Sequence, residues 1–227
     1  MHTKNCLAAF LMAFVIPAAI TSAQTKTCVP EDALILFDGN DLSQWTKEDG
    51  GPAEWKIVDG AMQVIPGKGS IMTKQNFQDC RLHIEFNLPQ PSADSNDQDR
   101  SNSGVYIQRR YEVQILDSFG LEPQINGCGA IYRLRAPDKN LCKPPGSWQT
   151  YDIFFRAARF EGNGENSKKI EDARITVLHN GTVIHNNVKI TNKTGAGKPE
   201  GPEAAPILLQ DHGSPVRFRN IWAVPLN

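Results

Sequence analysis

The sequence predicts an all-β protein, a sandwich or a barrel, and three observations support this prediction. Short runs of alternating apolar and polar residues recur at roughly ten-residue spacing, separated by Gly, Pro, Asn and Asp. Two pairs of runs flank the two-residue turns Asp59-Gly60 and Asn180-Gly181, which tight β-hairpins prefer. No long stretch has the apolar repeat of an amphipathic helix. These features favour a sandwich or barrel over any α/β fold.

In the first half of the chain, each expected strand is a short apolar or alternating run that ends at turn residues. The run 81–86 is the clearest, because Leu82, Ile84 and Phe86 share one face, which we expect to enter the core. The expected strands are, in order, 34–37, 55–58, 61–65, 81–86, 104–108, 111–116 and 129–134.

The second half is expected to add one long strand, a hairpin around the Asn-Gly turn and two closing strands. Three long polar segments are expected as loops, and long loops on a sheet scaffold often hold functional residues, although plain mobility is the simpler interpretation. The strands are 150–160, 173–179, 182–186, 207–210 and 216–224, and the loops are 89–101, 162–169 and 193–206.

The first residues predict export. Lys4 supplies a positive charge, 6–20 is almost wholly apolar, and small residues follow up to Ala23. This is the layout of a secretory signal peptide over residues 1–23. The apolar run is shorter than the roughly 20 residues that span a bilayer, which disfavours the alternative of a signal anchor. We therefore expect a secreted or periplasmic protein whose remaining residues, 24–227, form a single domain.

Composition limits the partners. The chain has 24 basic and 25 acidic residues and a formal net charge of -1. This balance argues against nucleic acid or an anionic membrane as a partner, because both require a basic face. No later stretch is long and apolar enough to be expected to span a membrane.

Four cysteines remain after the predicted cleavage site: Cys28, Cys80, Cys128 and Cys142. In an exported chain this number suggests two disulfides, with three possible connectivities. We favour Cys128–Cys142, which closes a loop rich in turn residues, and Cys28–Cys80, which ties the N-terminus to the start of a strand. A zinc site is the rival interpretation, but no C-x-x-C or nearby His pair supports it.

Two consecutive strands place polar side chains on the face opposite the core. In 101–108, alternation directs Val105 and Ile107 inward and leaves Asn102, Tyr106 and Gln108 on the other face. In 111–117, Glu112 and Gln114 lie opposite the core-facing Tyr111, Val113 and Ile115, and Asp117 ends the strand. Amides, a phenol and carboxylates suit hydroxyl-rich ligands and proton transfer. An ordinary solvated sheet face is the simpler alternative.

A third group lies in 210–220, at a tight turn between two expected strands. Asp211 and His212 flank the turn together with Gln210, and a His of near-neutral pKa can act as general acid or base. Arg217 and Arg219 alternate with the core residue Phe218, and an arginine can hold a carbonyl oxygen or an oxyanion. A turn histidine and two surface arginines are the plainer interpretation. Trp148 and Tyr106 could stack on a sugar ring.

The motifs of the chain resemble those of the 3-keto-disaccharide hydrolase family. The opening motif is 36–45 (LFDGNDLSQW), and the others follow in the order of the family over roughly residues 34–226. They are 55–60 with 71–73, 102–106 (NSGVY), 111–117 (YEVQILD), 129–132 (GAIY), 148–152, 210–213 (QDHG) and 216–221. The combined set is specific, whereas the opening motif alone is only suggestive.

The resemblance implies a concanavalin A-like jelly-roll β-sandwich of two antiparallel sheets with a concave ligand face. It also implies activity on glycosides whose C3 hydroxyl is oxidised to a ketone. Such a ketone acidifies the C2 proton, so that a base can remove it and the C1 leaving group is expelled; water then adds back. This reaction needs a base, an acid and a stabiliser for the enolate.

On the matched motifs, the resemblance implies a catalytic set of Glu112, Asp117, Asp211, His212 and Arg219, with His212 or Glu112 as base and Arg219 as enolate stabiliser. From residue type and alternation together with the motifs, we expect substrate to be bound by Asn102, Tyr106, Gln108, Gln114, Tyr132, Trp148, Gln210 and Arg217. The resemblance identifies no specific cofactor for this set. A divalent metal bound by Glu112, Asp117 or Asp211 is the alternative stabiliser.

A non-catalytic carbohydrate-binding module on the same jelly roll is the competing hypothesis. An enzyme should gather at least two ionisable groups and an arginine at one cleft, whereas a binding module should present aromatic platforms and neutral amides. Because the ionisable candidates all lie in matched motifs, the sequence favours the enzyme, with a small carbohydrate as its partner.

Overall fold

A computed structural model describes residues 29–162 and 166–226. The predicted signal peptide 1–23 and Cys28 lie outside these ranges. The described residues form fifteen β-strands and no α-helix. No helix in this part of the chain has the length and hydropathy of a membrane span.

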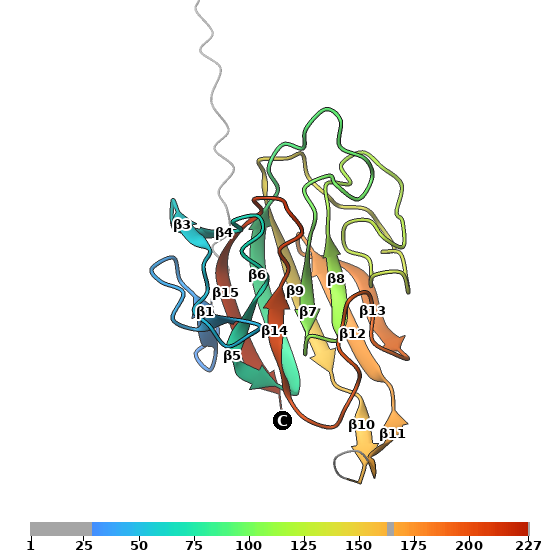
Figure 1. Ribbon diagram of the computed structural model, residues 1–227. Helices are drawn as coiled ribbons and strands as arrows, with labels where there is room; N and C mark the ends of the chain where they lie inside the picture. The colour runs from blue at the N-terminus through green and yellow to red at the C-terminus, as the bar shows by residue number, and fades with distance from the viewer. Residues whose placement is uncertain (1–28, 163–165, 227) are drawn as a thin grey trace, which may run out of the picture.

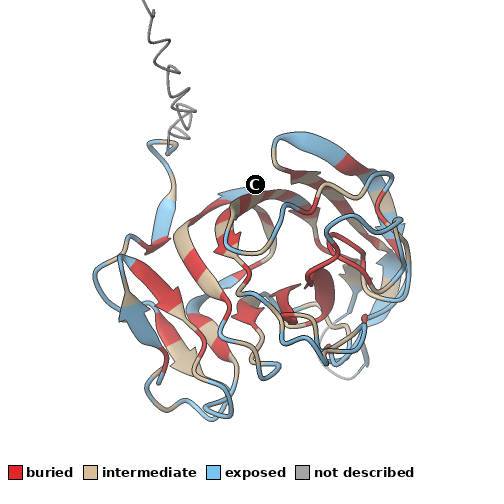
Figure 2. Ribbon diagram, turned by 90° about the horizontal axis from the view of Figure 1, so that it is seen from above, coloured by how far each residue is buried: buried red, intermediate tan, exposed pale blue. Residues whose placement is uncertain are grey.

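Two antiparallel sheets face each other and form a sandwich, as Figures 1 and 2 show. The predicted all-β jelly-roll class is therefore confirmed. The larger sheet has the order β13-β12-β9-β6-β15-β4-β3, with β1 also paired to β15; the smaller has the order β2-β5-β14-β7-β8. The larger sheet contains β1 (Leu34–Phe37), β3 (Lys56–Val58), β4 (Ala61–Gln63), β6 (Asp79–Asn87), β9 (Trp148–Arg156), β12 (Ala173–His179), β13 (Thr182–Ile190) and β15 (Arg217–Leu226).

The smaller sheet contains β2 (Trp45–Lys47), β5 (Ile71–Phe77), β7 (Ser103–Ile107), β8 (Tyr111–Ile115) and β14 (Ala205–Leu209). A separate two-stranded ribbon consists of β10 (Arg159–Glu161) and β11 (Lys168–Glu171). The sequence reasoning missed β5, whose middle is the polar run Lys74, Gln75 and Asn76, and it placed part of β11 in a loop. The run 129–134, predicted as a strand, makes only isolated bridges, because Gly129 and Arg133 have left-handed backbone angles (φ 79° and 57°).

The core lies between the sheets and is built by alternation. In β6, Leu82, Ile84 and Phe86 are completely buried, as predicted. Burying such side chains contributes roughly 1.5–3 kcal/mol each. The red segments of Figure 2 face one another across this interior.

Strands β7 and β8 differ from the rest, because every one of their residues is buried. Strand β8 is the edge of the smaller sheet, and two segments hydrogen bond to it. Tyr132 N donates to Glu112 O (3.1 Å), and Thr194 N donates to Arg110 O (2.9 Å). These segments cover the edge and also the face that points away from the core. Alternation alone would allow this face of β7 and β8 to be exposed to solvent, but in the structure it is covered by these segments.

The favoured disulfide Cys128–Cys142 is not formed. Cys80, Cys128 and Cys142 are buried free thiols. Cys128 and Cys142 are nevertheless neighbours: burial raises the pKa of Cys128, and a hydrogen bond with Cys128 lowers the pKa of Cys142. The hydroxyl of Tyr151 lies 3.2 Å from Cys128 Sγ. The Cys28–Cys80 pairing falls on a residue outside the described ranges.

A candidate active site under the edge of the smaller sheet

One polar pocket of about 400 Å³ opens on the covered face of β7 and β8. This volume lies within the range of small-molecule sites. Strands β7 and β8 pair Tyr106 with Glu112 and Gly104 with Gln114, which sets these polar side chains next to one another. The lining residues are Asn102, Tyr106, Glu112, Gln114, Tyr132, Arg133, Gly195, Ala196, Gln210 and His212. Seven of the residues predicted from the sequence are therefore brought together here.

Glu112 is the buried acid of this pocket, only 3% exposed. Two glycines make room for it. A Cβ on Gly104 would lie 2.5 Å from Glu112 Oε1, and a Cβ on Gly195 would overlap Oε2. With its amide oriented so that the nitrogen faces acceptors, Gln114 donates to Glu112 Oε1 (3.1 Å) and to Ser103 O (2.9 Å). Oε2 is buried and has no hydrogen-bond partner within the described ranges, which leaves an unsatisfied acceptor in the pocket lining.

Burial raises the pKa of Glu112 from its ordinary 4.5 to about 7, because a charged carboxylate is disfavoured away from water. The neighbouring Tyr106 hydroxyl opposes part of this rise, because a donor beside the carboxyl group favours its charged form. A carboxyl group that titrates near neutral pH can both accept and return a proton. Perturbed groups of this kind cluster at functional sites.

This pKa predicts how stability depends on pH. Between pH 4.5 and about 7 the native state keeps a proton that the unfolded chain has lost, so the free energy of unfolding falls as pH rises through this window. The loss is about 3 kcal/mol and is complete above the folded pKa. The Glu112→Gln variant lacks this pH-dependent loss. Relative to the parent, its free energy of unfolding should therefore rise by that amount between about pH 4 and about pH 8. Urea unfolding at each pH measures this difference; a constant difference would contradict the assignment.

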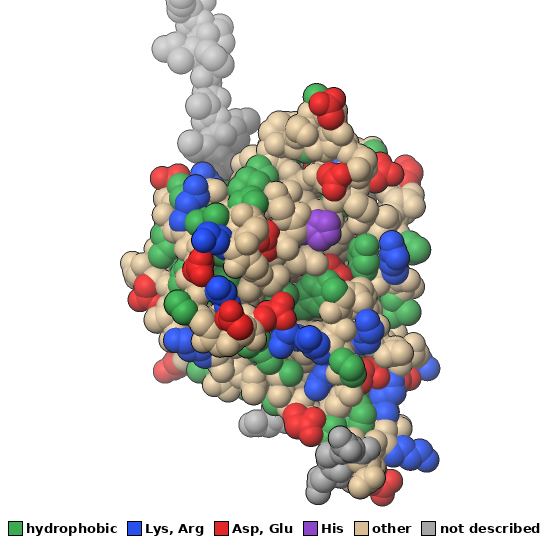
Figure 3. Space-filling model, in the orientation of Figure 1, with side chains coloured by type: hydrophobic (Ala, Val, Ile, Leu, Met, Phe, Trp, Pro, Cys, Tyr) green, Lys and Arg blue, Asp and Glu red, His purple; other side chains and the backbone are tan. Residues whose placement is uncertain are grey.

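The rim of the pocket supplies positive and neutral polar groups. His212 is exposed on the loop before β15, and Figure 3 shows a histidine on this face of the molecule. Arg133 is also exposed, and its guanidinium lies 5.5 Å from the centre of the Tyr132 ring. Gln210 Nε2 donates to the Tyr106 hydroxyl (3.4 Å), while Gln210 Oε1 is buried with no partner among the described residues. Buried polar atoms without partners are candidates for ligand contacts.

Sequence reasoning missed Arg133, Gly195 and Ala196. Arg133 directly follows the matched Tyr132, which is the one signal that could have found it. Gly195 lies in a predicted loop far along the chain, and only its tertiary contact with Glu112 identifies it.

Three predicted residues near the pocket have structural partners instead. Gln108 adopts a left-handed backbone (φ 55°), which ends the alternation of β7, and its side chain donates to Phe77 O (2.9 Å). Asp117 is 1% exposed and pairs with Arg100 (2.7 Å). Asp211 accepts from Gly69 N and Gly213 N (3.0 Å each), and so holds the loop that carries His212. None of the three lines the pocket.

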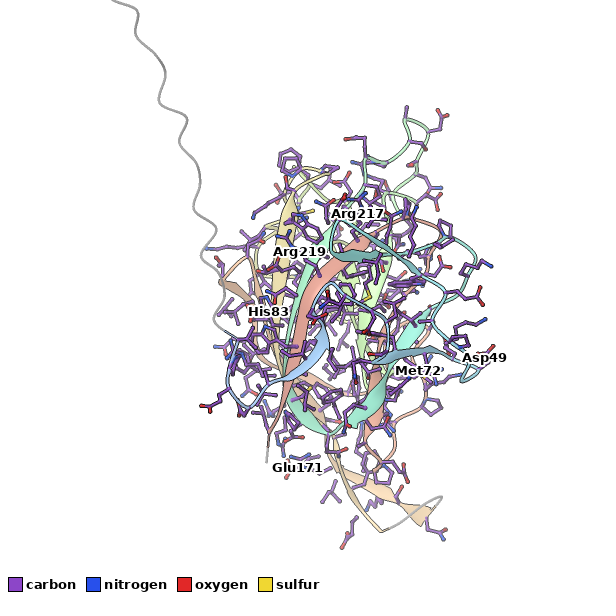
Figure 4. The ribbon with its side chains drawn as sticks, turned by 90° about the vertical axis from the view of Figure 1, so that its left-hand side faces the viewer. Asp49, Met72, His83, Glu171, Arg217 and Arg219 are labelled. Carbon is purple, nitrogen blue, oxygen red and sulfur yellow. The ribbon has the colours of Figure 1, made fainter. Side chains whose placement is uncertain are left out.

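Arg217, Arg219 and Trp148 lie on the other sheet, which corrects their predicted place in the site. Arg219 donates to Glu85 (2.7 Å) and stacks 3.9 Å from the centre of the Trp148 ring. Arg217 donates to Gln63 (2.9 Å). Figure 4 shows both arginines along β15 of the larger sheet. The chain crosses from β14 in one sheet to β15 in the other, so residues that follow His212 leave the pocket.

The three carboxylates predicted as metal ligands do not converge. Glu112 lies in the pocket, Asp117 pairs with Arg100, and Asp211 holds a turn. Across 29–162 and 166–226, no three His, Cys, Asp or Glu side chains gather in a way that could hold a metal ion. Glu112, Asp117 and Asp211 therefore do not form the predicted metal site.

Comparisons with known proteins agree with this fold. The model of the 3-keto-alpha-glucoside-1,2-lyase-like domain matches residues 32–224. A crystal structure of a candidate glycosyl hydrolase from Parabacteroides distasonis ATCC 8503 is 40% identical with a TM-score of 0.79, over 87% of this chain and 85% of that chain. A second one from the same organism is 24% identical, with a TM-score of 0.58 over 86% and 99%, and shows the fold alone.

No curated protein matched the chain. The family model spans almost all of the residues that form the two sheets, and it includes every residue that lines the pocket. The chain therefore belongs to the 3-keto-alpha-glucoside-1,2-lyase-like domain family.

Proposed function

We propose that the protein is a carbohydrate-active enzyme that cleaves 3-keto glycosides by elimination across C1 and C2, followed by hydration. The observation that supports this proposal best is Glu112, a buried carboxyl group with a pKa near neutrality in a polar pocket. The family match and the 40% identical candidate glycosyl hydrolase support the same class of substrate.

In the proposed reaction, Glu112 removes the C2 proton, which the C3 ketone has made acidic. The electron pair of the C2–H bond forms an enolate, whose negative oxygen needs a nearby cation or donor. Arg133 takes the role that the sequence gave to Arg219, since it is the arginine that lines the pocket. Collapse of the enolate expels the C1 oxygen, which receives a proton from His212. Water then adds across the new C1–C2 double bond and gives the free 3-keto sugar.

An activity assay tests the proposal. Purified protein is incubated with 3-keto-trehalose and 3-keto-lactose, with the unoxidised sugars as controls, and with and without a chelator. Release of monosaccharide from the keto sugars alone supports the proposal, and loss of activity with the chelator would reveal a metal requirement. Binding of keto sugars without cleavage would instead favour a carbohydrate-binding module. Because residues 1–23 have the layout of a secretory signal peptide, we also propose that the reaction takes place outside the cytoplasm; N-terminal sequencing of the mature protein tests this.

The two arginines give a matched prediction. Replacing Arg133 with Met removes the cation at the pocket and should lower kcat/KM on a 3-keto disaccharide by about 10²-fold, in the range for the loss of one oxyanion-stabilising group. Arg219→Met removes an equal charge from the outer side of the larger sheet and should leave kcat/KM within about two-fold of the parent, because Arg219 touches Glu85 and Trp148 rather than the pocket. Steady-state kinetics of both variants measure these losses. Equal losses of kcat/KM would contradict the assignment of Arg133 as the enolate stabiliser.

A further inference from the structure

The segment 194–203, which connects β13 to β14, lies against the edge strand β8. Glu112 N donates to Thr194 Oγ1 (2.7 Å), and Lys198 N donates to Arg109 O (2.7 Å). These bonds, together with that from Thr194 N to Arg110 O, tie the start of the segment to the backbone beside Glu112.

The closest approach of this segment to the pocket is at Gly195, which adopts a left-handed backbone (φ 50°). A Cβ at this position would overlap Glu112 Oε2 and would lie 3.0 Å from Tyr132 Cδ1 and 3.3 Å from the Tyr106 hydroxyl oxygen. The backbone of Gly195 is therefore packed directly on the carboxyl group. It occupies space that water would otherwise fill.

Two charged side chains outside the pocket anchor the rest of the segment. Arg110 is 8% exposed; its Nε donates to Pro199 O and its Nη1 to Glu203 O (3.1 Å each). Glu200 accepts from the Tyr111 hydroxyl (2.5 Å) and from Lys169 Nζ (2.7 Å). Within the described ranges no carboxylate lies within ion-pair distance of Arg110. Its hydrogen bonds go to the carbonyl oxygens of Pro199 and Glu203 in the segment and to Gln108 Oε1 (3.0 Å). Removing one partner of such a buried charge is costly, which makes this anchor rigid.

We propose that Arg110 and Glu200 are positioning residues that hold the segment 194–203 against Glu112 and thereby exclude water from its carboxyl group. The inference rests on the proposed function, in which Glu112 is the base. Its physical basis is that a carboxyl group loses its raised proton affinity when water reaches it. The other titratable groups at the pocket are Tyr106 from β7, Tyr132 and Arg133 from the segment after β8, and His212 from the loop before β15.

The test removes one anchor at a time and follows Glu112 itself. Glu200→Ala deletes the partner of Tyr111 and Lys169 at a position that is not fully buried, and thermal unfolding checks that the variant is folded. Arg110→Met deletes the buried anchor. Protein labelled with ¹³C at the glutamate carboxyl carbons is titrated by NMR, and the Glu112→Gln variant identifies the Glu112 signal. In each anchor variant we expect the pKa of Glu112 to fall by about one unit or more toward its ordinary value.

A matched control separates positioning from a general loss of stability. Asp79→Asn breaks a partly buried ion pair with Arg159 (2.5 Å) at the start of β6, away from the pocket, and should leave the Glu112 titration unchanged. An unchanged pKa of Glu112 in both anchor variants, or an equal fall in Asp79→Asn, would overturn the inference. The titration needs no substrate. Failure to cleave keto sugars would therefore sink the proposed function alone, whereas an unmoved titration would sink this inference alone.

Discussion

The Glu112→Gln variant is expected to lose about 10²–10⁴-fold of kcat/KM on a 3-keto disaccharide, the range for removal of a general base. The amide keeps the size of the side chain and one acceptor oxygen, but it cannot take a proton at neutral pH. Binding of the keto sugar should change little, because Asn102, Gln114 and Gln210 remain in place. Kinetics and binding measured on the same preparation separate the two effects.

A carboxyl group on the other sheet provides the control for this variant. Glu85 is partly buried and accepts hydrogen bonds from Arg219 and Asn220 (2.7 and 2.9 Å). The Glu85→Gln variant should lose some stability and retain its activity. If Glu112→Gln stays within ten-fold of the parent while fully folded, Glu112 is not the base, and His212, the other candidate base, takes that place.

The second large effect is expected from Gly104→Ala. The new Cβ would lie 2.5 Å from Glu112 Oε1, a distance that real Cβ atoms do not tolerate, so the carboxyl group must move. A displacement of about 1 Å at a catalytic group can lower the rate by about 10²-fold. We therefore expect a loss of kcat of that order in a protein that still folds. Kinetics combined with thermal unfolding measure both properties.

Gly146→Ala is a demanding control for this substitution. Gly146 has a left-handed backbone (φ 84°), which disfavours alanine, but no atom lies within 4 Å of the position that its Cβ would occupy. The Gly146→Ala variant should therefore lose free energy of unfolding, as Gly104→Ala is expected to do, but keep its activity. If both variants lose activity in proportion to their stability, the loss at Gly104 does not arise from the position of Glu112.

Local patterns predicted the elements where one short stretch contains the whole signal. The Asp59-Gly60 and Asn180-Gly181 hairpins formed as expected, since a two-residue turn fixes both the register and the direction of its strands. Alternation placed Leu82, Ile84 and Phe86 in the core and put Tyr106 and Glu112 together on the opposite face. Alternation failed where backbone angles left the strand region, as at Gln108 and Arg133.

Nearness in sequence was misleading for the arginines. Arg217 and Arg219 follow His212 closely, and a cleft that included all three was a reasonable expectation. The tight turn after His212, however, carries the chain from the smaller sheet to the larger one. A turn of a few residues is enough to move the chain from one sheet to the other, and the alternation within a strand does not indicate which sheet the strand joins. Arg133 entered the pocket from a segment that had been predicted as a strand.

The sequence by itself determined the fold class, the apolar faces of the main strands and the presence of Glu112, Tyr106, Gln114 and His212 in one site, because these depend on local periodicity and on recognisable motifs. Only the tertiary structure decided that Glu112 is buried and titrates near neutral pH. That property comes from water exclusion by two segments outside β8, the one that contains Tyr132 and the segment 194–203, which cover this edge strand. The proton affinity of a carboxyl group depends on everything packed around it, and its neighbours along the chain are only a small part of that surrounding.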